Sequence, residues 1–176
     1  MKAYEIISEL IDVELQKNTK KNYRELNYFP GDEVYCAINE KSSISLLKMT
    51  WGIIPEWGVK IKQTIQITNT RVESAIKKNY YKTKLLHNRC VILAKGYMEK
   101  NFSTSNNEEY LFYNNNVLLP IAGIFEKKKI TGLCTWKKPM YQCSMMTKQS
   151  HSEISHIHHR MPVILSTYDV DAWLSP

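Results

Sequence analysis

The 176-residue sequence has no long apolar segment, no CxxC cysteine pair and no recognisable secretory leader. Its best apolar run, residues 117–125, is broken by Pro120 and falls well short of the roughly 18 residues that span a bilayer. Acidic side chains occupy the first turns, where a signal peptide needs an apolar stretch, so we expect a cytoplasmic protein without a membrane partner. The four cysteines are then expected to be buried, inert thiols and not a disulfide framework.

The sequence also has fewer acidic than basic side chains, 17 against 24, which gives a formal net charge of +7. This excess favours a polyanion such as nucleic acid as the partner, although a lysine-rich surface that serves only solubility explains the charge equally well. The 43% hydrophobic and 23% charged fractions are ordinary for a folded chain and exclude disordered and collagen-like classes. The length favours one domain over residues 1–176.

The hydrophobic pattern predicts an α+β fold in which short strands outnumber helices. Helices are expected over residues 5–16, 73–79 and 150–155, with a terminal turn at 169–174. Strands are expected over residues 34–39, 44–51, 64–70, 89–97, 109–113, 117–125 and 134–146, and again within 160–165. Asparagines at 114–116 tolerate left-handed turns, so the strands on either side of them are expected to form a hairpin. Together these elements indicate a curved, barrel-like, mostly antiparallel sheet with flanking short helices.

Five local clusters carry most of the side chains that could do chemistry. They are Trp51–Trp57, Ile67–Ser74, Arg89–Glu99, Ala122–Glu126 and Ile157–Leu165. Their order and spacing closely resemble the SOS response-associated peptidase (SRAP) family, the abasic-site processing proteins, from Phe29 onward. The resemblance implies a protein that recognises an abasic site in single-stranded DNA and links itself to the sugar aldehyde during the DNA damage response.

The resemblance implies catalytic roles for Asn69, Glu99 and His158. Asn69 would hydrogen-bond the ring-opened sugar or hold the attacking amine, and Glu99 would accept and return protons during addition and dehydration. His158 suits opening of the sugar ring, because imidazole titrates near neutral pH. Without the resemblance, Glu99 reads as a solvated acid at a strand end and His158 as a buried, hydrogen-bonded histidine.

The attacking group of the family is an N-terminal cysteine, and this sequence begins instead with Met1 and Lys2. An amine and a neighbouring thiol close a durable thiazolidine on an aldehyde, whereas an amine alone gives a reversible imine. The available nucleophiles are the α-amine of a retained Met1 and the ε-amine of Lys2, with ordinary pKa values of about 8 and about 10.4. A longer natural chain that carries a cysteine upstream is a further alternative.

The resemblance also implies a DNA-binding surface. Arg71 and Arg160 would clamp phosphates on either side of the lesion, and Trp51 and Trp57 would stack on exposed bases. The alternatives are surface ion pairs for the two arginines and buried core positions for the two tryptophans. Glu73 is expected to orient Arg71.

Four histidines between residues 151 and 159 raise the question of a metal, because positions 156 and 158 would share one face of a strand. No paired cysteine or acidic cluster completes a four-ligand set, so we expect neither a metal nor a cofactor. The expected partner is single-stranded DNA with an abasic site, bound by a monomer. The alternative function is a catalytically impaired paralogue that binds single-stranded or damaged DNA without a covalent bond.

Overall fold

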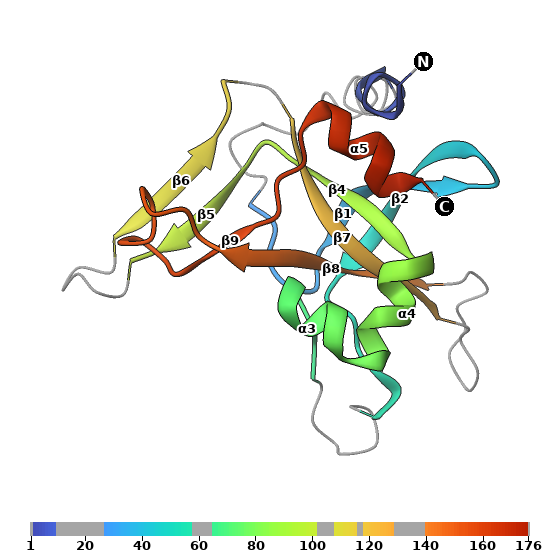
Figure 1. Ribbon diagram of the computed structural model, residues 1–176, viewed down its shortest axis with the longest axis horizontal. Coiled ribbons are helices and arrows are strands. Elements are labelled where there is room, and N and C mark those ends of the chain that lie inside the picture. The colour runs from blue at the N-terminus through green and yellow to red at the C-terminus, as the bar shows by residue number, and fades with distance from the viewer. Residues whose placement is uncertain are drawn as a thin grey trace.

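A ring of strands forms the body of the computed structural model, which describes residues 2–9, 27–57, 65–101, 108–115, 118–128 and 140–175 (Figure 1). In ring order the strands are β2 (Ser43–Trp51), β1 (Glu33–Glu40), β4 (Arg89–Ala94), β7 (Leu119–Lys128) and β8 (Met140–Gln149). Neighbouring strands along this order are antiparallel. A parallel contact between β2 and β8, which aligns Thr50 with Gln142 and Trp51 with Cys143, closes the ring. The predicted α+β fold with a barrel-like, mostly antiparallel sheet is therefore confirmed.

Two short strands attach to β8 beyond the ring. β3 (Asn69–Arg71) runs parallel to β8, and β9 (Arg160–Pro162) runs antiparallel to it. Thr147 of β8 is aligned with Arg71 of β3 and with Pro162 of β9. Segments that lie far apart in the sequence thus meet along one strand.

Apolar side chains fill the inside of the ring. The alternating residues Val34, Cys36 and Ile38 of β1 are buried there, as the period of two along a strand requires. Burying a side chain of this size stabilises the fold by roughly 1.5–3 kcal/mol. Cys90 and Cys143 belong to the same cluster, and all three thiols are free and fully buried. The prediction of buried thiols is confirmed for these three, while Cys134 lies outside the described residues.

Helices cover two outer faces of the ring. Residues 3–9 are helical and pack with α5 (Thr167–Leu174) against Ala37 and Val91. α3 (Val72–Lys77) and α4 (Asn79–His87) pack over Ala122 and Ile124 of β7. Ser166 and Asp169 form a capping box that begins α5, so the expected terminal turn is a helix. No helix in the described segments is long and apolar enough to cross a membrane.

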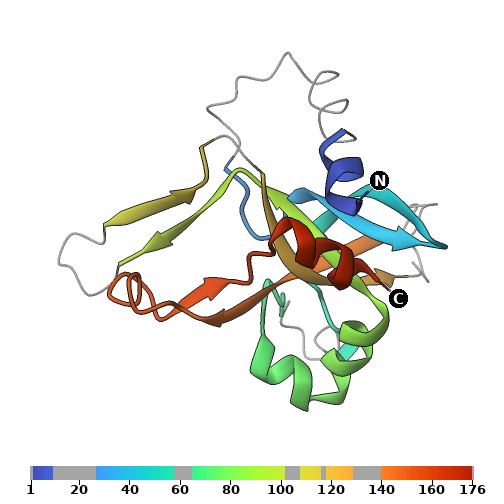
Figure 2. The same ribbon diagram turned by 45° about the horizontal axis from the view of Figure 1, so that its top comes forward.

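A two-stranded ribbon of β5 (Gly96–Lys100) and β6 (Glu109–Tyr113) projects from the ring (Figure 2). The predicted strand over residues 89–97 is therefore divided near Lys95 between ring and ribbon. The predicted hairpin of 109–113 with 117–125 is wrong, because β6 pairs with β5 while β7 pairs with β4 and β8. The first residues of β7 are buried in the ring, whereas β6 alternates between half-buried and exposed positions. Asn115 does adopt a positive φ of 26°, which asparagine tolerates. Its turn follows β6 but does not join β6 to a strand paired with it.

Other predicted elements differ in length. Between residues 64 and 70, only 69–70 belong to a strand, and Ile67 forms an isolated bridge with Ile53. The expected helix over 150–155 is instead a series of turns over 152–157. Helix α4 was not predicted, because its apolar residues do not follow a clear helical period. Residues 10–16, 64, 117 and 134–139 of the predicted elements lie outside the described residues.

Chemical inertness of the thiols is a first testable consequence. Burial raises the pKa of Cys36 and of Cys90, and the thiolate is the reactive form. We expect iodoacetamide to leave Cys36, Cys90 and Cys143 unmodified in the native protein and to modify all three in denaturant, as read by peptide mass spectrometry. Rapid native modification of any of them would show that the ring opens.

Candidate active site

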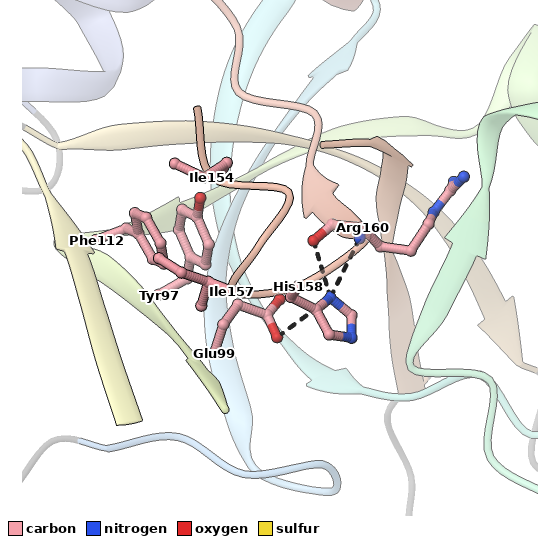
Figure 3. Close-up of a pocket in the computed structure, with 7 residues that line it drawn as sticks. All are labelled: Tyr97, Glu99, Phe112, Ile154, Ile157, His158 and Arg160. Carbon is pink, nitrogen blue, oxygen red and sulfur yellow. Dashed lines mark hydrogen bonds and ion pairs between the residues drawn. The ribbon is translucent and has the colours of Figure 1, made fainter. Parts of the chain in front are cut away.

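A small pocket lies between the β5–β6 ribbon and the turns that lead into β9 (Figure 3). It is a shallow hollow, whose unoccupied space of about 160 Å³ includes open solvent. Its lining residues are Tyr97, Glu99, Phe112, Ile154, Ile157, His158 and Arg160. One side is apolar, and the other carries the Glu99 carboxylate, the His158 imidazole and the main chain of Arg160, whose guanidinium points away from the pocket. Figure 3 shows the Glu99 carboxylate and the His158 ring pointing toward each other.

The ribbon places Glu99 inside this pocket. Tyr97 and Glu99 lie on the same face of β5, because side chains alternate along a strand, while Met98 on the other face is 47% exposed. Tyr97 is paired with Phe112 of β6, and the two rings stack with centroids 4.8 Å apart. Burial among these groups raises the pKa of Glu99, and the nearby His158 partly opposes this rise. Glu99 therefore holds a proton to higher pH than an exposed glutamate does.

Consecutive turns place His158 opposite Glu99. The main-chain N–H groups of Ile157 and His158 both donate to the carbonyl of Ile154, at 3.0 and 3.3 Å. The Ser150 hydroxyl donates to the carbonyl of His158 at 2.7 Å. Buried Asn101 donates to the carbonyl of His156 at 3.3 Å, which ties these turns to the end of the ribbon. Main-chain hydrogen bonds on both sides thus fix the imidazole.

The Nδ1 atom of His158 has three polar neighbours. It lies 3.6 Å from Oε2 of Glu99, 2.9 Å from the carbonyl oxygen of Arg160 and 3.2 Å from the main-chain nitrogen of Arg160. A protonated Nδ1 donates to the carbonyl, and an unprotonated Nδ1 accepts from the N–H group. The main chain of Arg160 therefore suits both protonation states of Nδ1 without rotation of the ring. Together Glu99 and His158 form a pair able to take up and release protons.

The guanidinium of Arg160 is bound to Glu73. Its two terminal nitrogens donate to the two carboxylate oxygens at 3.0 and 3.1 Å, a bidentate pair that lowers the pKa of Glu73. One of them also donates to the carbonyl of Thr147 at 2.6 Å. Glu73 was expected to orient Arg71, but its direct hydrogen bonds reach across β8 to Arg160, and the charge of Arg71 only adds to the lowering of its pKa. Arg71 itself is exposed at the end of β3.

The remaining predicted residues lie apart from this pocket. Asn69 is exposed on β3, aligned with Met145, and does not line the pocket. Lys2 lies over the ring of Tyr168, with Nζ 4.4 Å from its centroid, beside α5. Met1 is outside the described residues. Of the four predicted catalytic side chains that are described, the structure brings Glu99 and His158 together and leaves Asn69 and Lys2 outside the pocket.

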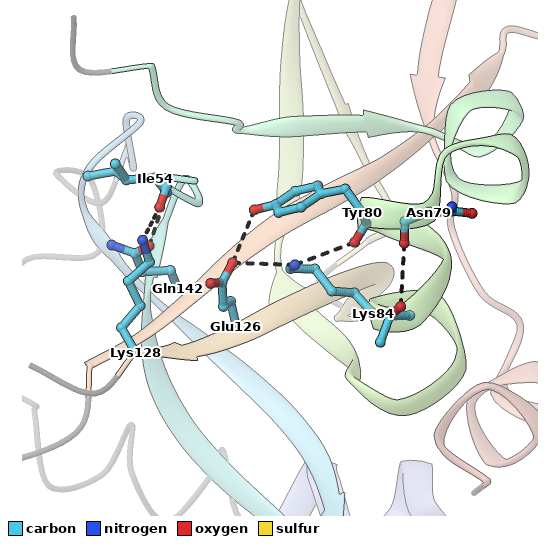
Figure 4. Close-up of polar contacts among 8 residues, drawn as sticks. Ile54, Asn79, Tyr80, Lys84, Glu126, Lys128 and Gln142 are labelled. Atoms are coloured by element: carbon cyan, nitrogen blue, oxygen red, sulfur yellow. Dashed lines mark hydrogen bonds and ion pairs between the residues drawn. The ribbon is translucent and has the colours of Figure 1, made fainter. Parts of the chain in front are cut away.

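The two tryptophans have different surroundings. Trp51 packs on the ring interior, and its Nε1 donates to the carbonyl of Thr68 at 3.0 Å. Trp57 is 51% exposed. The chain before Trp57 is held at Ile54, whose N–H donates to Gln142 and whose carbonyl accepts from Lys128 (Figure 4). Trp57 is therefore partly open to solvent, whereas Trp51 packs against the core.

A second polar cluster attaches α4 to β7 and lies near the same segment (Figure 4). Glu126 accepts a hydrogen bond from the hydroxyl of Tyr80 at 3.1 Å and lies 3.5 Å from the ammonium group of Lys84. Burial and the Glu126 carboxylate raise the pKa of Tyr80 above its ordinary value. All three side chains pair with one another, so the role we infer for this cluster is to hold α4 on β7.

Sequence analysis missed the apolar wall of the pocket, formed by Tyr97, Phe112, Ile154 and Ile157. Tyr97 could have been predicted, because it precedes Glu99 by two residues on a strand and therefore lies on the same face. Ile154 and Ile157 could not, because a series of turns has no fixed period. Within the described residues, no group of three or more His, Cys, Asp or Glu side chains is arranged to hold a metal ion.

Comparison with known proteins shows the family of the chain. The family model described as SOS response associated peptidase (SRAP) matches residues 2–176. The chain belongs to the SRAP family. It is 28% identical to the abasic site processing protein YoaM of Bacillus subtilis, over 99% of this chain and 76% of that protein. It is also 28% identical to the abasic site processing protein HMCES of Gallus gallus, over 77% of this chain and 46% of that protein.

Solved structures support the SRAP fold. A crystal structure of a protein from Bacteroides thetaiotaomicron matches with a TM-score of 0.67 and 24% identity, covering 86% of this chain and 66% of that one. A second crystal structure, of a protein from Bordetella bronchiseptica, matches with a TM-score of 0.68 and 18% identity over 84% of this chain and 75% of that one. At these identities the likeness establishes the fold.

The raised pKa of Glu99 predicts how stability changes with pH. The folded state holds the proton above the ordinary glutamate pKa of about 4.3, so the wild type loses stability as pH rises from there through the folded pKa. Glu99→Gln keeps the shape and has no such loss. As pH rises over this range, we expect the free energy of unfolding of Glu99→Gln to increase relative to that of wild type. The expected increase is about 1.4 kcal/mol for each unit by which the pKa of Glu99 is raised.

Urea unfolding at several pH values measures this difference. Glu109→Gln is the matched control, because Glu109 lies exposed on the same ribbon in an ion pair with Lys100. A pH-independent difference between wild type and Glu99→Gln would contradict the burial of the Glu99 carboxyl.

Proposed function

We propose that this protein recognises abasic sites in single-stranded DNA and reacts with the sugar aldehyde in the DNA damage response, forming an imine. The observation that carries the proposal is the Glu99–His158 pair, 3.6 Å apart in a pocket with an apolar wall. Membership of the SRAP family and the name "abasic site processing protein" borne by its relatives support the same substrate. We further propose that the protein acts as a monomer in the cytoplasm and needs no cofactor.

The pocket suits the proton transfers of imine formation. An amine nitrogen bonds to the aldehyde carbon, and the carbonyl oxygen takes up a proton. Loss of water then needs a second proton on that oxygen and removal of a proton from nitrogen. Glu99, with its raised pKa, donates to the oxygen, and His158 accepts from the nitrogen.

The position of Lys2 favours a second candidate, a binding module that forms no covalent bond. Residues 3–9 are held against α5, where the main-chain N–H of Ala3 donates to Asp171 at 2.6 Å and Ile7 is fully buried. In Figures 1 and 2 this helix and the β5–β6 ribbon lie at different ends of the molecule. Imine formation by Lys2 therefore requires the amino-terminal helix to leave its site.

DNA contacts follow from exposure and charge. Arg71 is exposed and has no ion-pair partner among the described residues, so it is available to a phosphate. Trp57 is available to stack on a base. Arg160 reaches a phosphate only in competition with Glu73. We assign Asn69, which lies beside Arg71 on β3, to the sugar or phosphate next to the pocket.

Borohydride trapping distinguishes the two candidates. The protein is incubated with single-stranded DNA that carries one abasic site, with and without borohydride, and adducts are read on denaturing gels. We expect an adduct only after reduction, because an imine hydrolyses and its reduced form does not. Binding without any adduct would establish the non-covalent module, and a heat-stable adduct without reductant would contradict attack by an amine alone.

Variants of the pocket serve as controls for this trapping experiment. Glu99→Gln and His158→Ala should each slow trapping by about 100-fold with little change in DNA affinity, since a general acid or base contributes at least that factor. Glu109→Gln on the same ribbon should trap at the wild-type rate. Equal losses of trapping and affinity in the pocket variants would indicate structural roles.

Salt dependence tests the phosphate contact of Arg71. Affinity for single-stranded DNA should fall steeply with salt, and Arg71→Ala should reduce the slope of log affinity against log salt by about one unit. Fluorescence anisotropy titrations measure the slope. Lys48→Ala, which removes an exposed charge from β2, is the control and should leave it unchanged. An unchanged slope in Arg71→Ala would remove Arg71 from the DNA surface.

A further inference from the structure

Glu73 lies outside the pocket but is connected to it by an unbroken series of contacts. It stands in the first turn of α3, and its side chain is 55% exposed. Both carboxylate oxygens are occupied by the guanidinium of Arg160, at 3.0 and 3.1 Å. A bidentate pair of this kind fixes orientation as well as distance, because two parallel hydrogen bonds resist rotation.

Arg160 depends on this pair for its position. Its side chain is only 16% exposed, and its Nε atom is buried without a hydrogen-bond partner in the described part of the chain. The carbonyl of Thr147 accepts from one terminal nitrogen, and Glu73 is the only acidic group paired with the guanidinium among the described residues. Loss of the carboxylate would leave a largely buried positive charge uncompensated, so the side chain and the strand that carries it would shift.

The main chain of the same residue holds His158. The carbonyl of Arg160 is 2.9 Å from Nδ1, shorter than the 3.2 Å from Nδ1 to the Arg160 nitrogen. The shorter contact is to the acceptor, which favours a proton on Nδ1 in the neutral ring. Nε2 is then the unprotonated atom, and Figure 3 shows it pointing away from Glu99.

We propose that Glu73 is a positioning residue for His158: by fixing Arg160, it holds the Arg160 carbonyl against Nδ1 and leaves Nε2 as the proton acceptor. The inference rests on the proposed function for its catalytic meaning. The structural claim is that an exposed carboxylate on α3 sets the tautomer of an imidazole across β8. This claim does not depend on the proposed function and can be measured without DNA.

Nitrogen-15 NMR of histidine-labelled protein tests this claim. Spectra are recorded about two pH units above the ordinary histidine pKa of about 6.5, and the signals of His158 are assigned by their loss in His158→Gln. We expect wild type to show Nδ1–H alone and Glu73→Gln to show a mixture of the two neutral tautomers. Glu109→Gln, an exposed carboxylate lost from the ribbon, should retain the wild-type spectrum. An unchanged His158 tautomer in Glu73→Gln would overturn the proposal.

The catalytic consequence has its own readout. Glu73→Gln should slow borohydride trapping about tenfold while its DNA affinity stays within about twofold of wild type, because only proton transfer is affected. Glu73→Asp keeps the charge and should recover part of the trapping rate. This variant also tests the proposal if Glu73→Gln folds poorly. If Glu73→Gln is trapped as fast as wild type, Glu73 has no catalytic role. Absence of trapping in wild type would refute the proposed imine chemistry, whereas the tautomer measurement would still decide the role of Glu73.

Discussion

Strand β8 is the element on which the rest of the structure depends. It pairs with β7 and β2 to close the ring, and with β3 and β9 beyond it. Backbone hydrogen bonds on both edges leave little freedom in register, since a slip by one residue would turn the buried side chains outward. β3 and β9 are therefore held in register on β8, and their ends carry Arg71, Arg160 and the chain leading from His158.

The pocket combines this rigid support with a more exposed one. His158 and Arg160 belong to the well-paired side, whereas Glu99 is presented by a ribbon of only two strands. A two-stranded ribbon gains stability by packing, and the Tyr97–Phe112 stack supplies that packing next to Glu99. The same rings line the pocket that holds Glu99, and burial there raises the pKa of its carboxyl. Packing of the ribbon and burial of the acid thus occur at the same place.

Local patterns predicted much of this fold but little of its pairing. The alternation through Val34, Cys36 and Ile38 marks a buried strand without any knowledge of its neighbours. The division of residues 89–100 between ring and ribbon depends on pairing with residues 9 to 35 positions further along the chain, and the predicted hairpin failed for that reason. Glu99 and His158 were singled out by family motifs, and the fold brings them together. The Glu73–Arg160 pair joins positions 87 residues apart, a contact that no local spacing encodes.

Because residues 3–9 pack on the ring, any reaction of the Lys2 amine away from this position depends on how many molecules have the helix detached. With Ile7 buried and Ala3 bonded to Asp171, the attached form dominates, and only the detached fraction of molecules presents Lys2 elsewhere. The observed rate of any reaction at that amine is its intrinsic rate multiplied by this fraction. A ligand that binds the detached form preferentially would raise the fraction by mass action, so ligand binding and exposure of the Lys2 amine are thermodynamically linked.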